Sequence, residues 1–562
     1  MKILPRFLAD EDEEDRRIAE EDEPGAAPVS GAASLSWYWT FGLVVVATLP
    51  RLIYIFLVSN PENAGDGWYG DTYHHWQIAY LTKEVGLTAP GGPRLWDLKG
   101  VEYFWGVLQP LMLVALFYLT GSIDIVLERL LSVAFGVLVV VLIFHLCRRH
   151  WGMRVAVPAT VFATLAPTSV FNDGQGILEP IGVGLTLLGI WLWPKRGLWT
   201  GVSWALAAMS RAEAWIFTIG MIVAAFLRRE GRRQGIPLLT GWVVLMLAYM
   251  KVLLDRTGNP IYPLSENFFN NALGRWVYAT TLTSDQLAVR PALGVLLVLA
   301  TLGLAWTLWK RPNGYMFLSF GMGYWVFTAG MLGFTSYLKL WMWWFWYIRF
   351  FAFPYQFAGV LIAIALFYLL PRWLGDRWAL PAAAAAGIVV LLGVQVAWVP
   401  ILSVYRSTEA PWAETLNAGQ LIGGIYRQPE NRDGVLNVPP NRPELTYALV
   451  RFEGVDGRHI VGQLYDPFYY LPASYRYPEH PQVAGVLMQC WLSDTHTRLL
   501  LVQQGPNVDQ GINPNYIAFI AQHPSWFTEV AQLPTYNYVL YRVDIPKPAA
   551  ADCATATKAA RA

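Results

Sequence analysis

The chain has 562 residues, of which 55% are hydrophobic and only 14% are charged, so it is too apolar for an ordinary soluble globular protein. Its apolar runs repeatedly reach the ~20 residues that a helix needs to cross a bilayer, which predicts a polytopic membrane protein. A formal net charge of +1 gives no nucleic-acid footprint, and three scattered cysteines, Cys147, Cys490 and Cys553, predict neither a disulfide framework nor a metal knuckle.

The N-terminal residues 1–35 are expected to form a disordered acidic tail. Their stretch 9–23, ADEDEEDRRIAEEDE, is too charged to bury enough surface to fold alone. An acidic run, rather than the basic one of a signal peptide, stands before the first apolar stretch. Residues 37–58 are therefore predicted to be an uncleaved first span, with the tail in the cytoplasm.

Residues 59–125 are expected to form a long outer loop that contains the focal segment of the chain. Within ten residues this segment carries Asp66, Asp71, His74 and His75. Asp71 is the candidate catalytic carboxylate, and a solvated loop acid or a helix N-cap is its plainer alternative. Asp66, beside two glycines, also suits a turn, and the two histidines also suit surface or hydrogen-bonding roles.

Positive charge decides the number and direction of the spans. If the apolar piece 104–121 does not cross, five basic clusters become cytoplasmic, as the loop-charge bias requires. These clusters are Arg148/Arg149/Arg154, Lys195/Arg196, Arg228/Arg229/Arg232/Arg233, Lys310/Arg311 and Arg372/Arg377. Residues 36–403 are then expected to form a membrane module of about eleven spans, at 37–58, 126–147, 155–171, 178–193, 197–210, 213–227, 236–254, 291–309, 315–337, 350–370 and 379–402.

The pattern changes after residue 403, and residues 404–548 are expected to form a soluble α/β domain outside the membrane. Residues 410–426 have helical spacing, whereas six short apolar runs indicate strands. These runs are GVLNVPP (434–440), TYALVRF (446–452), HIVGQLY (459–465), AGVLMQCWL (484–492), RLLLVQQ (498–504) and NYVLYRV (537–543). The Ala-rich end, 549–562, is expected to be loose.

This topology gathers acids and arginines at the outer ends of the spans. Besides the loop residues they are Arg129, Asp173, Glu179, Arg211, Glu213 and Arg349. A carboxylate that takes a hydroxyl proton, opposite cations that hold a phosphate, suits transfer of a sugar from a lipid phosphate. Each residue also has a structural alternative: snorkelling for the two span-end arginines Arg211 and Arg349, an Arg211–Glu213 salt bridge, and a helix start for Glu179.

The run Asp71-Thr72-Tyr73-His74-His75, leading to Ala79, resembles the catalytic loop of the GT-C superfamily of integral-membrane glycosyltransferases. That group includes protein O-mannosyltransferases, aminoarabinose lipid A transferases and the oligosaccharyltransferase catalytic subunit. The resemblance covers most of residues 37–402 and extends to the outer soluble domain; its other stretches are 128–152, 177–193, 205–217 and YIRFFAFP at 347–354. Thr72 departs from the family, which has an acid there.

The resemblance implies a cell-envelope enzyme that uses a polyprenyl-phosphate-linked sugar as donor, with inversion at the anomeric carbon. Its acceptor is a glycan, lipid or protein; membrane lipids surround it, and no nucleic acid takes part. Asp71 is then the general base. The candidate substrate-binding residues are Asp66, His74, His75, Arg129, Glu179, Arg211 and Arg349.

Two other functions stay open. One is an oligosaccharyltransferase-like, metal-dependent glycan transfer, with Mg²⁺ or Mn²⁺ on Asp173 and Glu179; their spacing departs from the close acidic pair of that family, and the Trp-Trp-Asp-x-Gly signature is absent from the soluble domain. The other is a non-enzymatic transporter or flippase of lipid-linked sugars. Transporters usually show internal repeats, and this sequence shows none.

Overall fold

The structure is a computed structural model that describes residues 37–65, 70–85, 101–227, 229–268, 284–337, 349–406, 409–439, 442–462, 481–504, 513–533 and 537–561. The chain divides into two units, Met1–Val46 and Ala47–Ala562. All contacts given below lie within the second unit. The expected disordered tail, residues 1–35, lies outside the described residues.

Seven helical stretches in the described part of the chain are long and apolar enough to cross a membrane, and the molecule is a polytopic membrane protein. They are α2 with η1 (Trp37–Ile53 and Tyr54–Val58), α6 (Val126–Trp151), α12 (Arg229–Thr257), α14 (Ser284–Lys310), α15 (Tyr315–Tyr337), α17 with η3 and α18 (Ala352–Ile364, Ala365–Leu369 and Leu370–Leu374), and α19 (Asp376–Arg406).

Four shorter helical stretches account for the remaining predicted spans. A bent pair, α7 (Met153–Thr164) and α8 (Pro167–Gln175), turns by 54° at its break and makes an eighth span if it is counted as one. The others are α9 (Glu179–Leu192), α10 (Gly197–Ser210) and α11 (Ala212–Phe226). Since these helices have 14, 14 and 15 residues, or about 21–23 Å, the expected count of eleven spans is not confirmed.

Small residues let these short helices pack closely. A Cβ atom added to Gly201 of α10 would lie 2.1 Å from the Leu238 carbonyl oxygen of α12, and one added to Gly241 would lie 2.4 Å from the Leu198 carbonyl oxygen. Only glycine fits such a backbone approach, which is a common device between membrane helices.

Four more helices lie in the loops: α3 (Gly70–Val85), α4 (Val101–Phe104), α5 (Leu108–Thr120) and α13 (Tyr262–Asn267). Helix α5 falls in the apolar piece 104–121. Its 13 residues extend about 20 Å, which is too short to cross a bilayer.

The C-terminal domain contains a five-stranded sheet of order β2-β1-β3-β5-β4. Strands β2, β1 and β3 are parallel, and β5 and β4 continue the sheet antiparallel. Leu436 of β1 pairs with Ile460 of β2, and Leu500 of β3 with Tyr541 of β5. The strands are β1 (Val435–Val438), β2 (Ile460–Gly462), β3 (Thr497–Gln503), β4 (Phe527–Leu533) and β5 (Tyr538–Val543).

The domain's helices correct three sequence expectations. The runs 446–452 and 484–492, expected as strands, lie in α21 (Pro443–Arg451) and α22 (Pro481–Asp494), and β4 was not foreseen. The end expected to be loose forms α24 (Ala550–Arg561), whose Cys553 is disulfide-bonded to Cys490 of α22. Two further helices are α20 (Glu409–Tyr426), as expected, and α23 (Asn513–Gln522).

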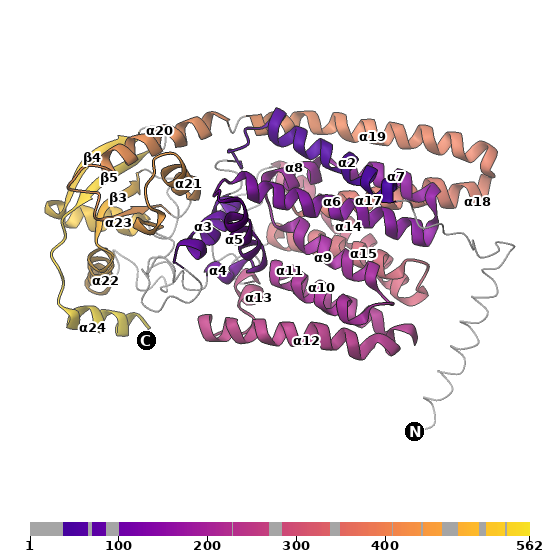
Figure 1. The fold of residues 1–562 in the computed structure, drawn as a ribbon, viewed down its shortest axis with the longest axis horizontal. Helices are drawn as coiled ribbons and strands as arrows, with labels where there is room; N and C mark the ends of the chain where they lie inside the picture. The colour runs from indigo at the N-terminus through magenta and orange to yellow at the C-terminus, as the bar shows by residue number, and fades with distance from the viewer. Residues whose placement is uncertain are drawn as a thin grey trace, which may run out of the picture. The chain divides into compact units, whose positions relative to one another are not determined.

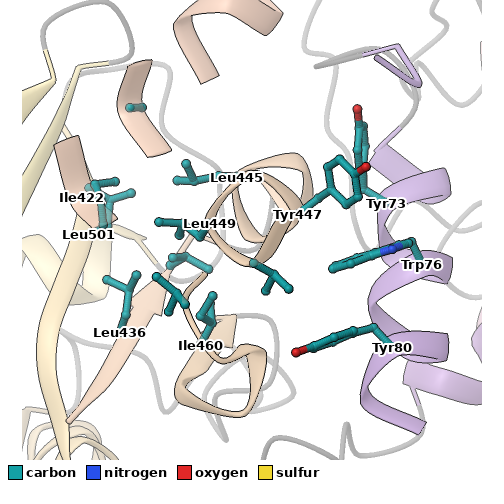
Figure 2. Close-up of a cluster of buried hydrophobic side chains, with 14 of the residues drawn as sticks. Tyr73, Trp76, Tyr80, Ile422, Leu436, Leu445, Tyr447, Leu449, Ile460 and Leu501 are labelled. Atoms are coloured by element: carbon teal, nitrogen blue, oxygen red, sulfur yellow. The ribbon is translucent and has the colours of Figure 1, made fainter. Parts of the chain in front are cut away.

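One hydrophobic cluster joins the sheet domain to α3. Leu436, Leu499 and Leu501 of the sheet pack with Leu445, Tyr447 and Leu449 of α21, and the cluster continues into Tyr73, Trp76 and Tyr80 of α3. Figure 1 shows α21 beside α3, and Figure 2 shows Trp76 and Tyr80 reaching from α3 toward α21. Helix α3 and the C-terminal domain therefore share one core.

Candidate active site

Helix α3 has two faces with different tasks. Tyr73, Trp76 and Tyr80 recur at helical spacing and are buried against the C-terminal domain. Asp71 and His75, four residues apart, lie on another face. The side chain of Asp71 also stands in the first turn of the helix, where the helix dipole stabilises a negative charge.

A row of alternating charges, which we call the charge chain, begins at Asp71 and continues through Arg349, Glu179 and Arg211 to Glu213. An Asp71 carboxylate oxygen lies 2.5 Å from Nη1 of Arg349, and Nε of Arg349 also donates to Glu179. Glu179 lies 3.3 Å from Nη2 of Arg211, whose Nε donates to Glu213 at 2.7 Å. The structure thus brings together Asp71, Glu179, Arg211 and Arg349 from the predicted set, with Glu213 as the foreseen partner of Arg211.

The residues of the charge chain come from four places far apart in sequence: the start of α3, the start of α9, the junction of α10 and α11, and the segment before α17. Short polar contacts fix that last segment, because Asn172 donates to the Arg349 carbonyl and Ser169 to the Ala352 carbonyl. Thr72 similarly ties α3 to the Gln175 carbonyl of α8 at 3.1 Å.

Asp71 has the most exposed side chain of the five residues in the charge chain. Its side chain is 28% exposed, compared with 11% for Arg349 and 4% for Glu179. Burial raises the pKa of the Asp71 carboxyl, but the Arg349 guanidinium, with smaller contributions from His75 and His74, holds that pKa below its ordinary value. Asp71 is therefore ionised at neutral pH and has access to solvent.

An apolar groove of about 120 Å³ is lined on one side by Arg211 and Glu213. Its walls come from α11, α13, α15 and the segment before α17, and include Ile216, Leu264, Phe327, Met331, Leu332 and Phe350. Charged residues beside apolar walls suit an amphiphile with an anionic head and a hydrocarbon chain.

His74 and His75 pack against Trp105, and the side chain of His75 is buried whereas that of His74 is partly buried. The centroids of their rings lie 5.8 and 5.1 Å from the ring centroid of Trp105. Nδ1 of His75 lies 3.6 Å from a carboxylate oxygen of Glu128, and Glu128 accepts a hydrogen bond from Gln109. Burial lowers the pKa of His74 to about 4 and that of His75 to about 3. Both rings are therefore neutral at neutral pH.

The two acids considered for a metal do not form a metal pair. Asp173 is buried and bonded to Nε of Arg51 at 2.6 Å, and Glu179 contacts both Arg349 and Arg211. Among the described residues, no three His, Cys, Asp or Glu side chains gather to hold a metal ion. Two carboxylates that each neutralise arginine do not fit the donor set of Mg²⁺ or Mn²⁺.

Arg129 lies apart from the charge chain. Its side chain is fully buried, and its guanidinium donates to Ser59 Oγ and to the carbonyls of Asn60, Pro61, Asn63 and Gly174. It holds the start of the outer loop against α8. Asp66 lies outside the described residues.

Three polar residues near the site were missed by the sequence reading. Glu128 and Gln109 form a buried pair beside His75, and Tyr324 of α15 borders two small cavities, which Glu179 also lines. A Glu directly before Arg129 at the start of an apolar span was the available signal for Glu128. Tyr324 lies in an aromatic-rich helix and carries no such signal.

The elements described so far define a class: an integral membrane protein whose bundle carries an ionic site at one end, next to a sheet domain that shares a core with the site helix. No protein-family model matches the chain, and no curated protein matches its sequence. Solved structures, however, share its fold.

The apo oligosaccharyltransferase of Archaeoglobus fulgidus matches with a TM-score of 0.51 at 11% identity, over 83% of this chain and 70% of that chain. AglB of the same organism, in complex with an inhibitory peptide and a dolichol-phosphate, matches with a TM-score of 0.51 at 12% identity, over 91% of this chain and 75% of that chain. ArnT from Cupriavidus metallidurans in the apo state matches with a TM-score of 0.48 at 15% identity, over 90% of this chain and 98% of that chain. The chain has the GT-C fold, as the sequence resemblance predicted.

Proposed function

We propose that this protein is a GT-C glycosyltransferase that moves a sugar from a polyprenyl-phosphate donor to an acceptor hydroxyl. One observation carries the proposal: a solvent-accessible carboxylate, Asp71, is linked through Arg349 and Glu179 to Arg211, which lines an apolar groove. The solved AglB complex with a dolichol-phosphate supports the same ligand chemistry.

The charges suit an inverting displacement. Asp71 removes the acceptor hydroxyl proton as the acceptor oxygen forms its bond to the anomeric carbon. The bond from that carbon to the phosphate oxygen breaks on the opposite face, and the phosphate keeps the electron pair. Arg349 and Arg211 stabilise the charge that grows on the phosphate, and the groove holds the isoprenoid chain.

We further propose that the site lies on the outer face of the membrane, with residues 1–35 as a cytoplasmic tail, residues 36–403 as the catalytic membrane module and residues 404–548 outside. The disulfide between Cys490 and Cys553 supports this orientation, because such bonds persist in oxidising compartments. The site also includes the beginning of α9, whereas Lys195 and Arg196 follow the other end of that helix.

The test is transfer of radiolabel from polyprenyl-phosphate mannose, glucose or pentose in membranes that contain the protein. Asp71→Asn keeps the size of the side chain and removes the base, so we expect transfer to fall by about 10²- to 10⁴-fold. Asp124→Asn is the matched control, because Asp124 is a partly exposed acid paired with Arg451 away from the charge chain. Full transfer by Asp71→Asn would remove Asp71 from the mechanism.

A further inference from the structure

The arginines proposed to hold phosphate are already engaged by carboxylates. Arg349 contacts Asp71 and Glu179, and Arg211 contacts Glu179 and Glu213. Three carboxylates face two guanidinium groups, so the chain of charges has one negative charge in excess. An anionic phosphate that approaches this site is repelled unless one carboxylate gives way or is neutralised.

Asp71 is the carboxylate placed to give way. Glu179 and Glu213 are buried, with side-chain exposures of 4% and 10%, and each would have to leave its arginine partners in a poorly solvated environment. Asp71 is more exposed, at 28%, and bonds a single arginine. Water can solvate it once it leaves Arg349, so its release is the least unfavourable of the three.

From this geometry, and resting on the proposed function, we infer that Asp71 and the donor's phosphate are alternative partners of Arg349. Before the donor binds, the salt bridge to Arg349 ties up the base. When the phosphate takes Arg349, Asp71 is freed next to the acceptor position. The donor therefore binds before the acceptor is activated, and an acceptor alone meets a carboxylate that is not available as a base.

The same exchange assists product release. After transfer, Asp71 carries the acceptor's proton and is neutral, so it does not compete with the departing polyprenyl phosphate for Arg349. Loss of that proton to water restores the carboxylate, which then returns to Arg349 and displaces the phosphate. Deprotonation of Asp71 is thus coupled to release of the polyprenyl phosphate from the site.

Binding of undecaprenyl phosphate to the purified full-length protein in detergent tests this exchange. Asp71→Asn removes the competing charge, so we expect its Kd to fall by about tenfold relative to wild type. Asp71→Ser serves as a second variant with the same expected direction. Asp124→Asn, which removes a carboxylate from Arg451 instead, is expected to leave the Kd unchanged. Thermal unfolding of each variant checks that it is folded.

The outcomes separate this inference from the proposed function. If Arg349→Gln weakens binding while Asp71→Asn and Asp71→Ser leave it unchanged or weaker, the exchange is wrong and the donor site stands. If neither Arg349→Gln nor Arg211→Gln affects binding, the donor site itself is wrong. Tighter binding by both Asp71 variants, lost when Arg349→Gln is added, supports the exchange.

Discussion

Single residues in this site have partners on several elements, and Glu179 shows the consequence most clearly. At the start of α9 its charge suits the helix dipole, which was its plainer interpretation from sequence. In the structure it also contacts both Arg349 and Arg211, so it holds the two cations side by side. Like charges held this close need a shared counter-ion, and Glu179 supplies it.

His75 makes the stability of the protein depend on pH. The folded protein keeps this buried ring neutral, because burial lowers its pKa to about 3, whereas the unfolded chain protonates it below about pH 6.5. The unfolded state therefore binds more protons between these values, and stability falls as the pH falls through this window. Between about pH 7 and about pH 5 the loss for this ring is about 2 kcal/mol.

We expect His75→Gln to lose less thermal stability than wild type when the buffer is changed from about pH 7 to about pH 5. His496→Gln is the control, because His496 is exposed. Equal acid sensitivity of wild type and His75→Gln would contradict the assignment of His75 as a buried neutral ring.

The site residues were predictable from sequence to different degrees. Asp71 and three residues at span ends, Glu179, Arg211 and Arg349, are of types that suit phosphate chemistry, and the structure brings these four together. Arg129 has the same type and place, but its guanidinium binds the carbonyls of the loop start, and no feature of its own segment tells the two cases apart. Asp173 likewise depends on Arg51, 122 residues away.

Helix α3 is the element on which the site and the C-terminal domain both depend. Tyr447 of α21 packs edge-on against Trp76, with ring centroids 4.9 Å apart, and its hydroxyl accepts a hydrogen bond from the Ile125 backbone N–H at 3.3 Å. A Cβ atom added to Gly70 would lie 3.4 Å from Cγ of Pro443, so the starts of α3 and α21 also meet. Asp71 is the residue after this contact.

We expect Tyr447→Ala to reduce transfer activity even though Tyr447 is assigned no contact with substrate, because the cavity loosens α3 and with it Asp71. The free energy of unfolding should fall by about 3–5 kcal/mol. Tyr447→Phe keeps the ring and loses one hydrogen bond, so about 1 kcal/mol is expected. Activity per folded molecule and urea unfolding measure the two effects.

Tyr516→Ala is the matched control, because Tyr516 is fully buried in the cluster on the opposite face of the sheet. It should destabilise the domain to a similar extent and leave more activity per folded molecule. If both variants lose activity in the same proportion, the effect reflects general unfolding rather than the position of α3.

The type of each element, helix or strand, was predictable where the apolar residues recur with a clear period. The prediction failed where the apolar runs are short. Runs of seven to nine residues such as 446–452 and 484–492 fit a buried strand or one face of a buried helix equally well, and packing decides between them. In α21 that packing is the contact with α3, and in α22 it includes the disulfide to α24. Neither partner is visible from the run itself.

For the whole molecule, the disulfide between Cys490 and Cys553 is the feature that bears on orientation. Counting three cysteines in 562 residues gave no reason to expect it, because the partners are 63 residues apart and their proximity depends on the fold. Cys147 is buried in α6 and remains a free thiol.

We expect a membrane-impermeant reductant, applied to intact cells that carry the protein, to free two thiols that then react with a membrane-impermeant maleimide. Cys490→Ser/Cys553→Ser should abolish this labelling, and Cys147→Ser should not affect it. Labelling that requires permeabilised cells would place the C-terminal domain in the cytoplasm and overturn the proposed orientation.

The shared core of α3 and α21 makes the C-terminal domain part of the membrane enzyme rather than an appendage, because Tyr447 and Trp76 are both fully buried in it. Without that domain, the apolar face of α3 that carries Tyr73, Trp76 and Tyr80 would meet water. The outer loop and the C-terminal domain are therefore expected to gain or lose their order together.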